Sequence, residues 1–94
     1  MNQKAEEIGC SDTHFVTPNG LDNGLNHYTT ASDLAKIARY AWLHARSFQK
    51  VVGTSSYSFR STQGRSYTSY TTNALLGTTP GVKGMKTGYT NKAG

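Results

Sequence analysis

The sequence has few of the features that define several common classes of protein. Cys10 is its only cysteine, so no disulfide can form within the chain, and a metal site would have one thiolate at most. Hydrophobic residues make up only 35% of the chain, and no apolar run approaches the roughly 18–20 residues that cross a bilayer. The first residues also lack the basic and then apolar pattern of a signal peptide. With 94 residues, we expect one small domain with a modest core.

Acidic residues are missing from the last two thirds of the chain. All five lie within residues 1–33, together with one lysine, which gives that segment a net charge of −4. Residues 34–94 contain nine lysines and arginines and no acid, a net charge of +9. Such a segment favours an anionic partner, which could be a nucleic acid, an anionic polymer or a substrate with a carboxylate. Charge alone does not choose among the three.

The beginning of the chain predicts a short helix followed by a long loop. Residues 1–8 have helical apolar spacing, and Gly9 stands where a left-handed cap belongs. The helix start has no N-cap residue, which we take as an indication that the chain is part of something longer. Residues 10–29 are expected to be loop, with turn signals at residues 17–20 and 22–24.

The clearest predicted element is a helix that starts at Thr30. Thr30 and Asp33 have the spacing of a capping box, with Asp in place of the usual Glu. At helical spacing one face is apolar, and we expect it, Trp42 included, to pack against the core. The residues of this face are Ala31, Leu34, Ala35, Ile37, Ala38, Ala41, Trp42 and Ala45. A second, short helix from Ser47 to Val52 should follow and stop at Gly53.

A β-hairpin is predicted in a segment rich in serine and threonine. Eleven of the nineteen residues 54–72 are Ser or Thr, but Tyr57 and Phe59 alternate with polar residues as in a half-buried strand. Gln63-Gly64 would turn the chain, and residues 67–72 would return it. The elements together predict a mixed α/β fold with helices beside an antiparallel sheet.

The tripeptide Lys86-Thr87-Gly88 lies in residues 82–90, which we predict to be a last short strand. Penicillin-recognising serine enzymes carry three motifs, namely Ser-x-x-Lys, Ser-x-Asn and Lys-Thr-Gly. A tripeptide alone is weak evidence for such an enzyme, so the assignment depends on the surrounding sequence.

Six stretches of the chain come in a characteristic order and spacing. They are Met1-Asn2-Gln3-Lys4-Ala5, Thr13-His14-Phe15-Val16, Pro18-Asn19-Gly20-Leu21-Asp22, His27-Tyr28-Thr29-Thr30-Ala31-Ser32-Asp33-Leu34, Asn73-Ala74-Leu75-Leu76 and Gly81-Val82-Lys83-Gly84-Met85-Lys86-Thr87-Gly88-Tyr89-Thr90. In this arrangement the chain resembles the D-alanyl-D-alanine carboxypeptidases, the low-molecular-mass penicillin-binding proteins of bacteria. The resemblance covers residues 1–94.

The resemblance implies a fold, an activity and a location. The fold would be part of the serine β-lactamase and penicillin-binding-protein type, with helices beside an incomplete antiparallel sheet. The activity would be a serine hydrolase that needs no cofactor. It removes the terminal D-alanine from peptidoglycan stem peptides through an acyl-enzyme, and β-lactams imitate its substrate. The parent protein would work in the cell envelope, outside the cytoplasm.

The chain also departs from the family pattern. In the family, Ser-x-Asn lies shortly upstream of the block at residues 1–5, and the nucleophilic Ser-x-x-Lys lies further upstream. This sequence has no Ser-x-Asn. We therefore expect residues 1–94 to form a partial catalytic domain that lacks the upstream nucleophile motifs and the downstream strands, and to be inactive alone. An unpaired edge of its last strand would invite self-association.

Four residues of the last predicted strand are candidate site residues. Lys86 would supply positive charge to the substrate's terminal carboxylate, and Thr87 would offer a hydroxyl to the same group. Gly88 would let a substrate backbone approach closely. By resemblance, the backbone N–H of Tyr89 would form half of an oxyanion hole. Strict strand alternation would put Lys86 and Thr87 on opposite faces, and their joint role is taken from the family.

Two other patterns have simpler explanations. Ser47-Phe48-Gln49-Lys50 has the letters of Ser-x-x-Lys, but we expect Ser47 to cap the second helix and Lys50 to face solvent. Cys10, His14 and His27 fit no standard zinc spacing, so no metal is expected. His27 falls in a block of the family where we expect a structural role in the loop.

The competing interpretation is a small basic module that binds nucleic acid or an anionic wall polymer. The hairpin is rich in tyrosine and arginine, and such side chains can stack on bases. Its members are Tyr57, Arg60, Arg65, Tyr67 and Tyr70. The segment has no recognised nucleic-acid motif, however, and we expect a solvated hairpin and no nucleic-acid partner.

Overall fold

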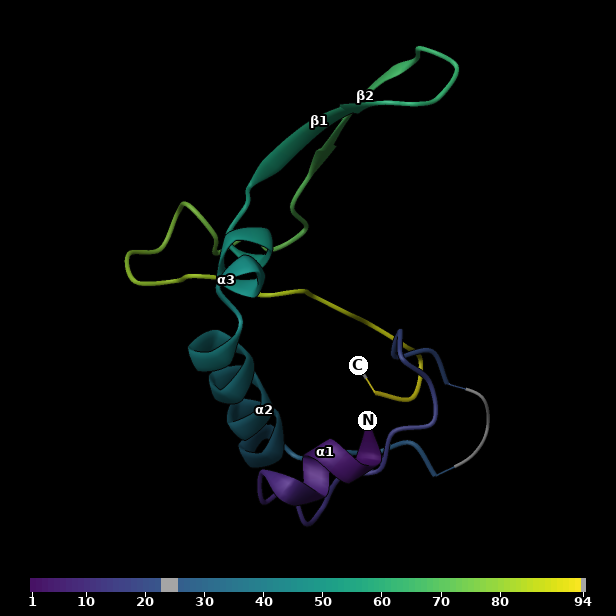
Figure 1. Ribbon diagram of the computed structural model, residues 1–94, viewed down its shortest axis with the longest axis vertical. Helices are drawn as coiled ribbons and strands as arrows, with labels where there is room; N and C mark the ends of the chain where they lie inside the picture. Colours follow the sequence, from purple (N-terminus) through teal and green to yellow (C-terminus); the bar gives the residue numbers. More distant parts are fainter. Residues whose placement is uncertain (23–25, 94) are drawn as a thin grey trace. The chain divides into compact units, whose positions relative to one another are not determined.

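The computed structural model describes residues 1–22 and 26–93, and in these residues it has three helices and one two-stranded sheet (Figure 1). The elements in chain order are α1 (Asn2–Glu7), α2 (Ala31–His44), α3 (Arg46–Val52), β1 (Ser56–Arg60) and β2 (Ser66–Tyr70). They form two compact units. The helical unit contains residues 1–45 and the segment that begins at Gly88, and the hairpin unit contains residues 46–87. This mixture of helices with an antiparallel sheet is the predicted fold class.

In the helical unit, the first predicted helix is present as α1. Gly9 follows it with φ +88°, so the prediction of a left-handed cap is confirmed. The side chain of Asn2 then fixes the next loop, because its Nδ2 donates to the carbonyl of Phe15 at 2.9 Å and its Oδ1 accepts from the N–H of Phe15 at 2.7 Å. Of the turn predicted at residues 22–24, residues 23 and 24 lie outside the described part of the chain.

Helix α2 begins where the capping box predicts. The Oγ1 of Thr30 accepts a hydrogen bond from the backbone N–H of Asp33 at 3.1 Å. The prediction of a packed apolar face is wrong in part, because Leu34 is 48% exposed and Trp42 is only half-buried. A chain of this length offers too few apolar neighbours to cover the whole face.

In the hairpin unit, α3 begins at Arg46, one residue before the predicted start, and ends before Gly53 as predicted. The later chain returns to the end of this helix. A Cβ on Gly53 would lie 3.3 Å from the carbonyl oxygen of Lys83, and one on Gly84 would lie 2.9 Å from that of Val52. Glycines at both positions therefore allow two backbone segments to approach closely.

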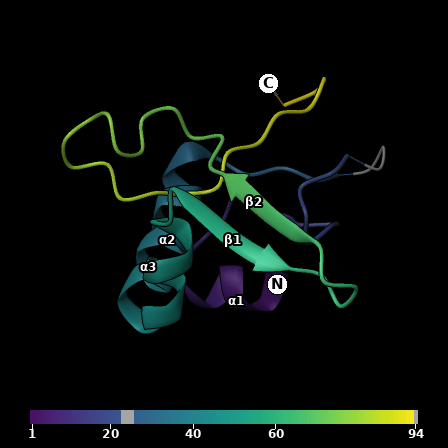
Figure 2. The same ribbon diagram turned by 90° about the horizontal axis from the view of Figure 1, so that it is seen from above.

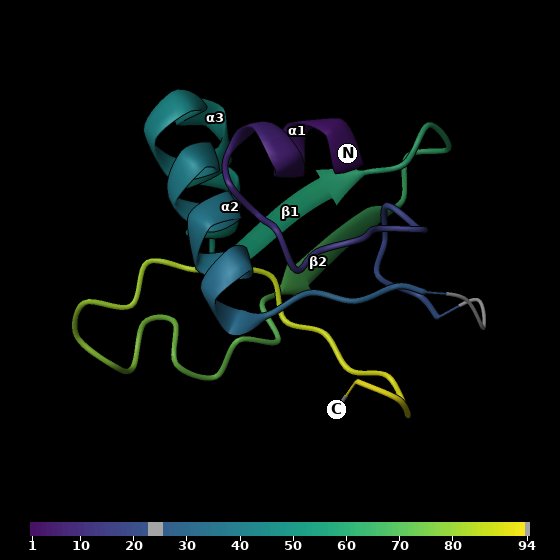
Figure 3. The same cartoon turned by 90° about the horizontal axis from the view of Figure 1, so that it is seen from below.

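The predicted hairpin is present, and β1 and β2 are antiparallel in register Tyr57↔Ser69 and Phe59↔Tyr67 (Figure 2). Gly64 makes the turn with φ +83°, and the N–H of Ser61 donates to the carbonyl of Arg65 at 2.8 Å. Figure 3 shows the two strands side by side from the other direction. The prediction of a half-buried strand is wrong, because every residue of both strands is exposed. Within the described hairpin unit, α3 does not bury either strand.

Residues 82–90 do not form the predicted last strand. A strand needs a neighbour to accept and donate its backbone hydrogen bonds, and the described residues pair none with this segment. None of the helices in the described residues combines the length and apolar character of a membrane span.

Candidate functional site

A pocket of about 890 Å³ lies within the hairpin unit. Its walls come from the end of α3, the start of β1, the end of β2 and the segment of residues 85–87. The side-chain types are hydroxylic, apolar and basic. The lining residues are Lys50, Val51, Val52, Thr54, Ser55, Ser56, Tyr57, Ser69, Tyr70, Thr71, Thr72, Met85, Lys86 and Thr87.

Lys86 and Thr87 line this pocket together with their neighbour Met85. Strict strand alternation would have placed Lys86 and Thr87 on opposite faces. The alternation requires a pleated strand, and this segment is not one. Two of the four candidate site residues thus share one pocket.

Gly88 and Tyr89 belong to the helical unit. Apart from Gly88 itself and its two chain neighbours, no described residue has an atom within 4 Å of the position that a Cβ on Gly88 would take, so the backbone there is open to a ligand. The side chain of Tyr89 is 76% exposed.

The hydroxyl of Thr87 has a partner that the sequence did not single out. Its Oγ1 is hydrogen-bonded to the Oγ1 of Thr72, fifteen residues earlier in the chain, and both residues line the pocket. The ammonium group of Lys86 donates to the backbone carbonyl of Thr87. Because Thr72 is one of eleven Ser and Thr residues in its segment, no local pattern distinguishes it.

The pocket is basic. Lys50 and Lys86 line it, and the whole of residues 34–94 contains no Asp or Glu. The hydroxyl groups on its walls can donate hydrogen bonds without adding charge. This combination of ammonium and hydroxyl donors, without a competing carboxylate, suits a ligand that carries an anionic group.

A second polar cluster, centred on Asp33, lies in the helical unit. The Asp33 side chain is almost completely buried, and its Oδ2 accepts from the N–H of Asp12 at 2.9 Å and from the Oγ1 of Thr13 at 2.7 Å. The Thr13 hydroxyl, followed by the Asp12 N–H, lowers the pKa of Asp33 below its ordinary value of 3.8. The capping box marked Asp33 as a helix residue, but this tie to the loop depends on tertiary contacts.

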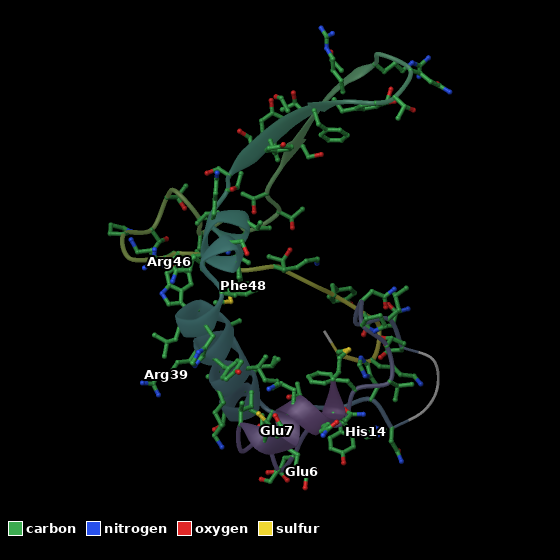
Figure 4. All side chains as sticks on the ribbon, in the orientation of Figure 1. Glu6, Glu7, His14, Arg39, Arg46 and Phe48 are labelled. Carbon is green, nitrogen blue, oxygen red and sulfur yellow. The ribbon has the colours of Figure 1, made fainter. Side chains whose placement is uncertain are left out.

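Cys10, His14 and His27 each have a partner that explains their position. The Cys10 thiol donates to the carbonyl of Asp33 at 3.5 Å, and His27 Nδ1 accepts from the N–H of Val16 at 2.9 Å. His14, labelled in Figure 4, pairs its backbone with Tyr28 in an isolated bridge. In the part of the chain that the structure describes, no three Cys, His or acidic residues are grouped as a metal site.

Ser47 is not the cap of α3. The helix begins at Arg46, so Ser47 lies inside its first turn, between the Arg46 and Phe48 labelled in Figure 4. The prediction of a capping role is therefore wrong. Lys50 is exposed, as expected, and also lines the pocket.

The family model and the individual relatives that match this chain point to the same family. Residues 1–94 match the model of the D-alanyl-D-alanine carboxypeptidase family. The chain is 39% identical to D-alanyl-D-alanine carboxypeptidase DacF of Bacillus subtilis over 93 residues, and 39% identical to DacB2 of Mycobacterium tuberculosis over 94 residues. In each case the match covers 99% of this chain, but only 23% of DacF and 32% of DacB2.

Two solved structures resemble the fold closely. The Streptomyces K15 DD-transpeptidase matches with a TM-score of 0.81 and 35% identity over 96% of this chain and 36% of that protein. Penicillin-binding protein D2 of Listeria monocytogenes, in its cefotaxime-bound form, matches with a TM-score of 0.79 and 29% identity over 99% of this chain and 37% of that protein. The chain thus has the fold of one portion of these proteins and spans about a quarter to a third of its relatives' length.

Proposed function

Because the chain belongs to the D-alanyl-D-alanine carboxypeptidase family, we propose that it forms the part of a serine carboxypeptidase that binds the terminal carboxylate of D-Ala-D-Ala peptides. The observation that carries the proposal is the family match over all 94 residues. The basic, hydroxyl-lined pocket that contains Lys86 and Thr87 supports it.

In this proposal each candidate residue has a separate task. The Lys86 ammonium attracts the carboxylate, and the Thr87 hydroxyl donates a hydrogen bond to it. Gly88 leaves room for the substrate backbone beside the chain. The backbone N–H of Tyr89 supplies one donor to the oxyanion that forms when the scissile carbonyl is attacked. Together these groups bind and orient the substrate but cannot cleave it.

Cleavage requires a nucleophile that these residues do not provide. In the family, that serine and its lysine come from the Ser-x-x-Lys motif, and this chain has neither that motif at the matching position nor a Ser-x-Asn. We propose that residues 1–94 act as a partial catalytic domain, completed by the nucleophile motifs and by further strands. The isolated chain is then catalytically silent.

The partners and location follow from the same proposal. The ligand is a peptidoglycan stem peptide that ends in D-Ala-D-Ala, and the complete site also takes β-lactams. The Listeria relative supports this, since its structures contain cefotaxime and ampicillin. A protein that acts on peptidoglycan works in the cell envelope.

Incubation of the 94-residue chain with a fluorescent penicillin tests the missing nucleophile. We expect the intact mass to stay unchanged and no D-alanine to be released from a D-Ala-D-Ala peptide. A penicilloyl adduct that Ser47→Ala removes would contradict this, because it would make the literal Ser-x-x-Lys of α3 a working nucleophile. Ser55→Ala is the matched control, since Ser55 also lies in the hairpin unit.

The basic-module interpretation explains the charge of residues 34–94 but not the family match. Binding of single-stranded DNA or heparin that survives physiological salt would support it. Binding that disappears as salt is raised would be non-specific, because counterion release makes such contacts strongly salt-dependent.

A further inference from the structure

We infer that Thr72 is a positioning residue that holds the hydroxyl of Thr87 in the orientation needed to donate to an anionic ligand. The inference rests on the proposed function, because it concerns the same carboxylate site. Its basis is the hydrogen bond between the two hydroxyl oxygens within one pocket.

The backbone on both sides of Thr72 is fixed. The N–H of Thr71 donates to the carbonyl of Ser55 at 2.7 Å, which extends the ladder of the hairpin by one bond. The N–H of Asn73 donates to the Oγ1 of Thr71 at 3.1 Å, and the Oδ1 of Asn73 accepts from the N–H of Leu75 at 3.1 Å. Thr72 therefore sits between a sheet end and a hydrogen-bonded turn, and its side chain is presented from a defined backbone position.

Hydroxyl chemistry gives the contact a direction when a carboxylate is bound. Each threonine hydroxyl has one proton to donate and two lone pairs, whereas an ionised carboxylate only accepts. If Thr87 donated to Thr72, it would turn a lone pair toward the carboxylate. If Thr72 donates to Thr87, the Thr87 proton is free to bind the ligand. Each of the two hydroxyl protons then takes part in a hydrogen bond. A bound anion therefore selects the order Thr72, Thr87, carboxylate.

This order also strengthens the hydrogen bond from the Thr87 hydroxyl to the carboxylate. Consecutive hydrogen bonds polarise one another, so a hydroxyl group that accepts one hydrogen bond donates a stronger second one. Residues 34–94 contain no Asp or Glu side chain that could compete for these donors within the pocket. The Lys86 ammonium already donates to the Thr87 carbonyl, so its positive charge lies beside the threonine that donates to the ligand.

Titration of the 94-residue chain with N-acetyl-D-alanine, followed by amide chemical shifts, tests the inference. We expect saturable shifts at residues 86–88 in the wild type. Thr72→Val should weaken the affinity by about threefold to tenfold, the effect of one lost hydrogen bond, whereas Thr72→Ser should retain it. Thr68→Val is the matched control, since Thr68 has its hydroxyl bond to Ser58 on the hairpin and does not line the pocket.

The double variant separates positioning from direct contact. If Thr72 acts through Thr87, the variant with both threonines changed to valine should bind no more weakly than Thr87→Val alone. Effects that add, or a Thr72→Val chain that binds as well as the wild type, would overturn the inference and leave the proposed function standing. A wild-type chain without saturable binding would overturn both, and this result is distinct from the other two.

Discussion

Asp33 links the start of α2 to the loop that precedes it. Its backbone N–H completes the cap of α2, its carboxylate accepts two hydrogen bonds from the loop at residues 12–13, and its carbonyl accepts from the Cys10 thiol. These donors favour the ionised form of the side chain, because a charged carboxylate is a stronger hydrogen-bond acceptor than a protonated carboxyl group. The loop that precedes α2 therefore depends on the charge state of one side chain.

The lowered pKa of Asp33 makes the stability of the helical unit fall in acid. Between the folded pKa and the unfolded value near 3.8, the unfolded state binds more protons, so stability rises with pH in that window. The contribution is complete above 3.8 and is lost as pH falls through the folded pKa. We expect Asp33→Asn to lower stability at neutral pH and to flatten this acid dependence, measured by thermal unfolding followed by circular dichroism.

Glu6→Gln is the matched control for this measurement. Glu6 projects from α1 as an exposed carboxylate (Figure 4), and its removal should leave the acid dependence intact. An Asp33→Asn chain with the same acid dependence as the wild type would show that Asp33 is not the group responsible.

Among the helices and strands, the capped N-terminus of α2 contributes measurably to the free energy of unfolding. Thr30→Ala removes the side-chain acceptor of the Asp33 N–H and should cost about 1 kcal/mol of the free energy of unfolding. In a domain of this size that corresponds to a fall in Tm of roughly 4–8 °C. Thr30→Ser keeps a capping hydroxyl and should stay within the error of the wild type. Equal melting of the alanine and serine variants would argue against the cap.

The elements that could be predicted from sequence are those defined by local signals. A capping hydroxyl at Thr30, glycines at positions 9 and 64, and the apolar spacing of α2 act within a few residues, and the structure has all of them. The predicted burial of Tyr57 and Phe59 and the strand at 82–90 failed, because both need neighbours from distant sequence. For the same reason nothing in the sequence distinguished Thr72.

For the whole molecule, the hairpin leaves strand edges unpaired. Within the described residues β1 pairs only with β2, so each strand has one free edge. Such edges can add a strand from a second copy. We therefore expect sizing chromatography of a dilution series to show dimers that dissociate as the protein is diluted. Monomer at every concentration would contradict this expectation.

One substitution can test the edge without breaking the hairpin. The bond between Ser61 and Arg65 places Phe59 and Tyr57 at hydrogen-bonded positions, so the N–H of Ser58 between them points to the free edge. Ser58→Pro removes that donor, and proline is tolerated on edge strands, so we expect the dimer to be lost. Ser58→Val keeps the N–H and should still associate. Association of the proline variant would place the contact elsewhere.

We propose above all that this chain supplies the carboxylate-binding part of a D-Ala-D-Ala carboxypeptidase site. The most direct test replaces the matching 93-residue segment of Bacillus subtilis DacF by this chain and measures D-alanine release. We predict an active chimera in which Lys86→Ala lowers kcat/KM by about 10- to 100-fold, as expected for a lost charged hydrogen bond. Lys83→Ala, on the same segment but outside the pocket, should have little effect. A folded chimera that releases no D-alanine, or one that Lys86→Ala leaves fully active, would contradict the proposed role of this chain.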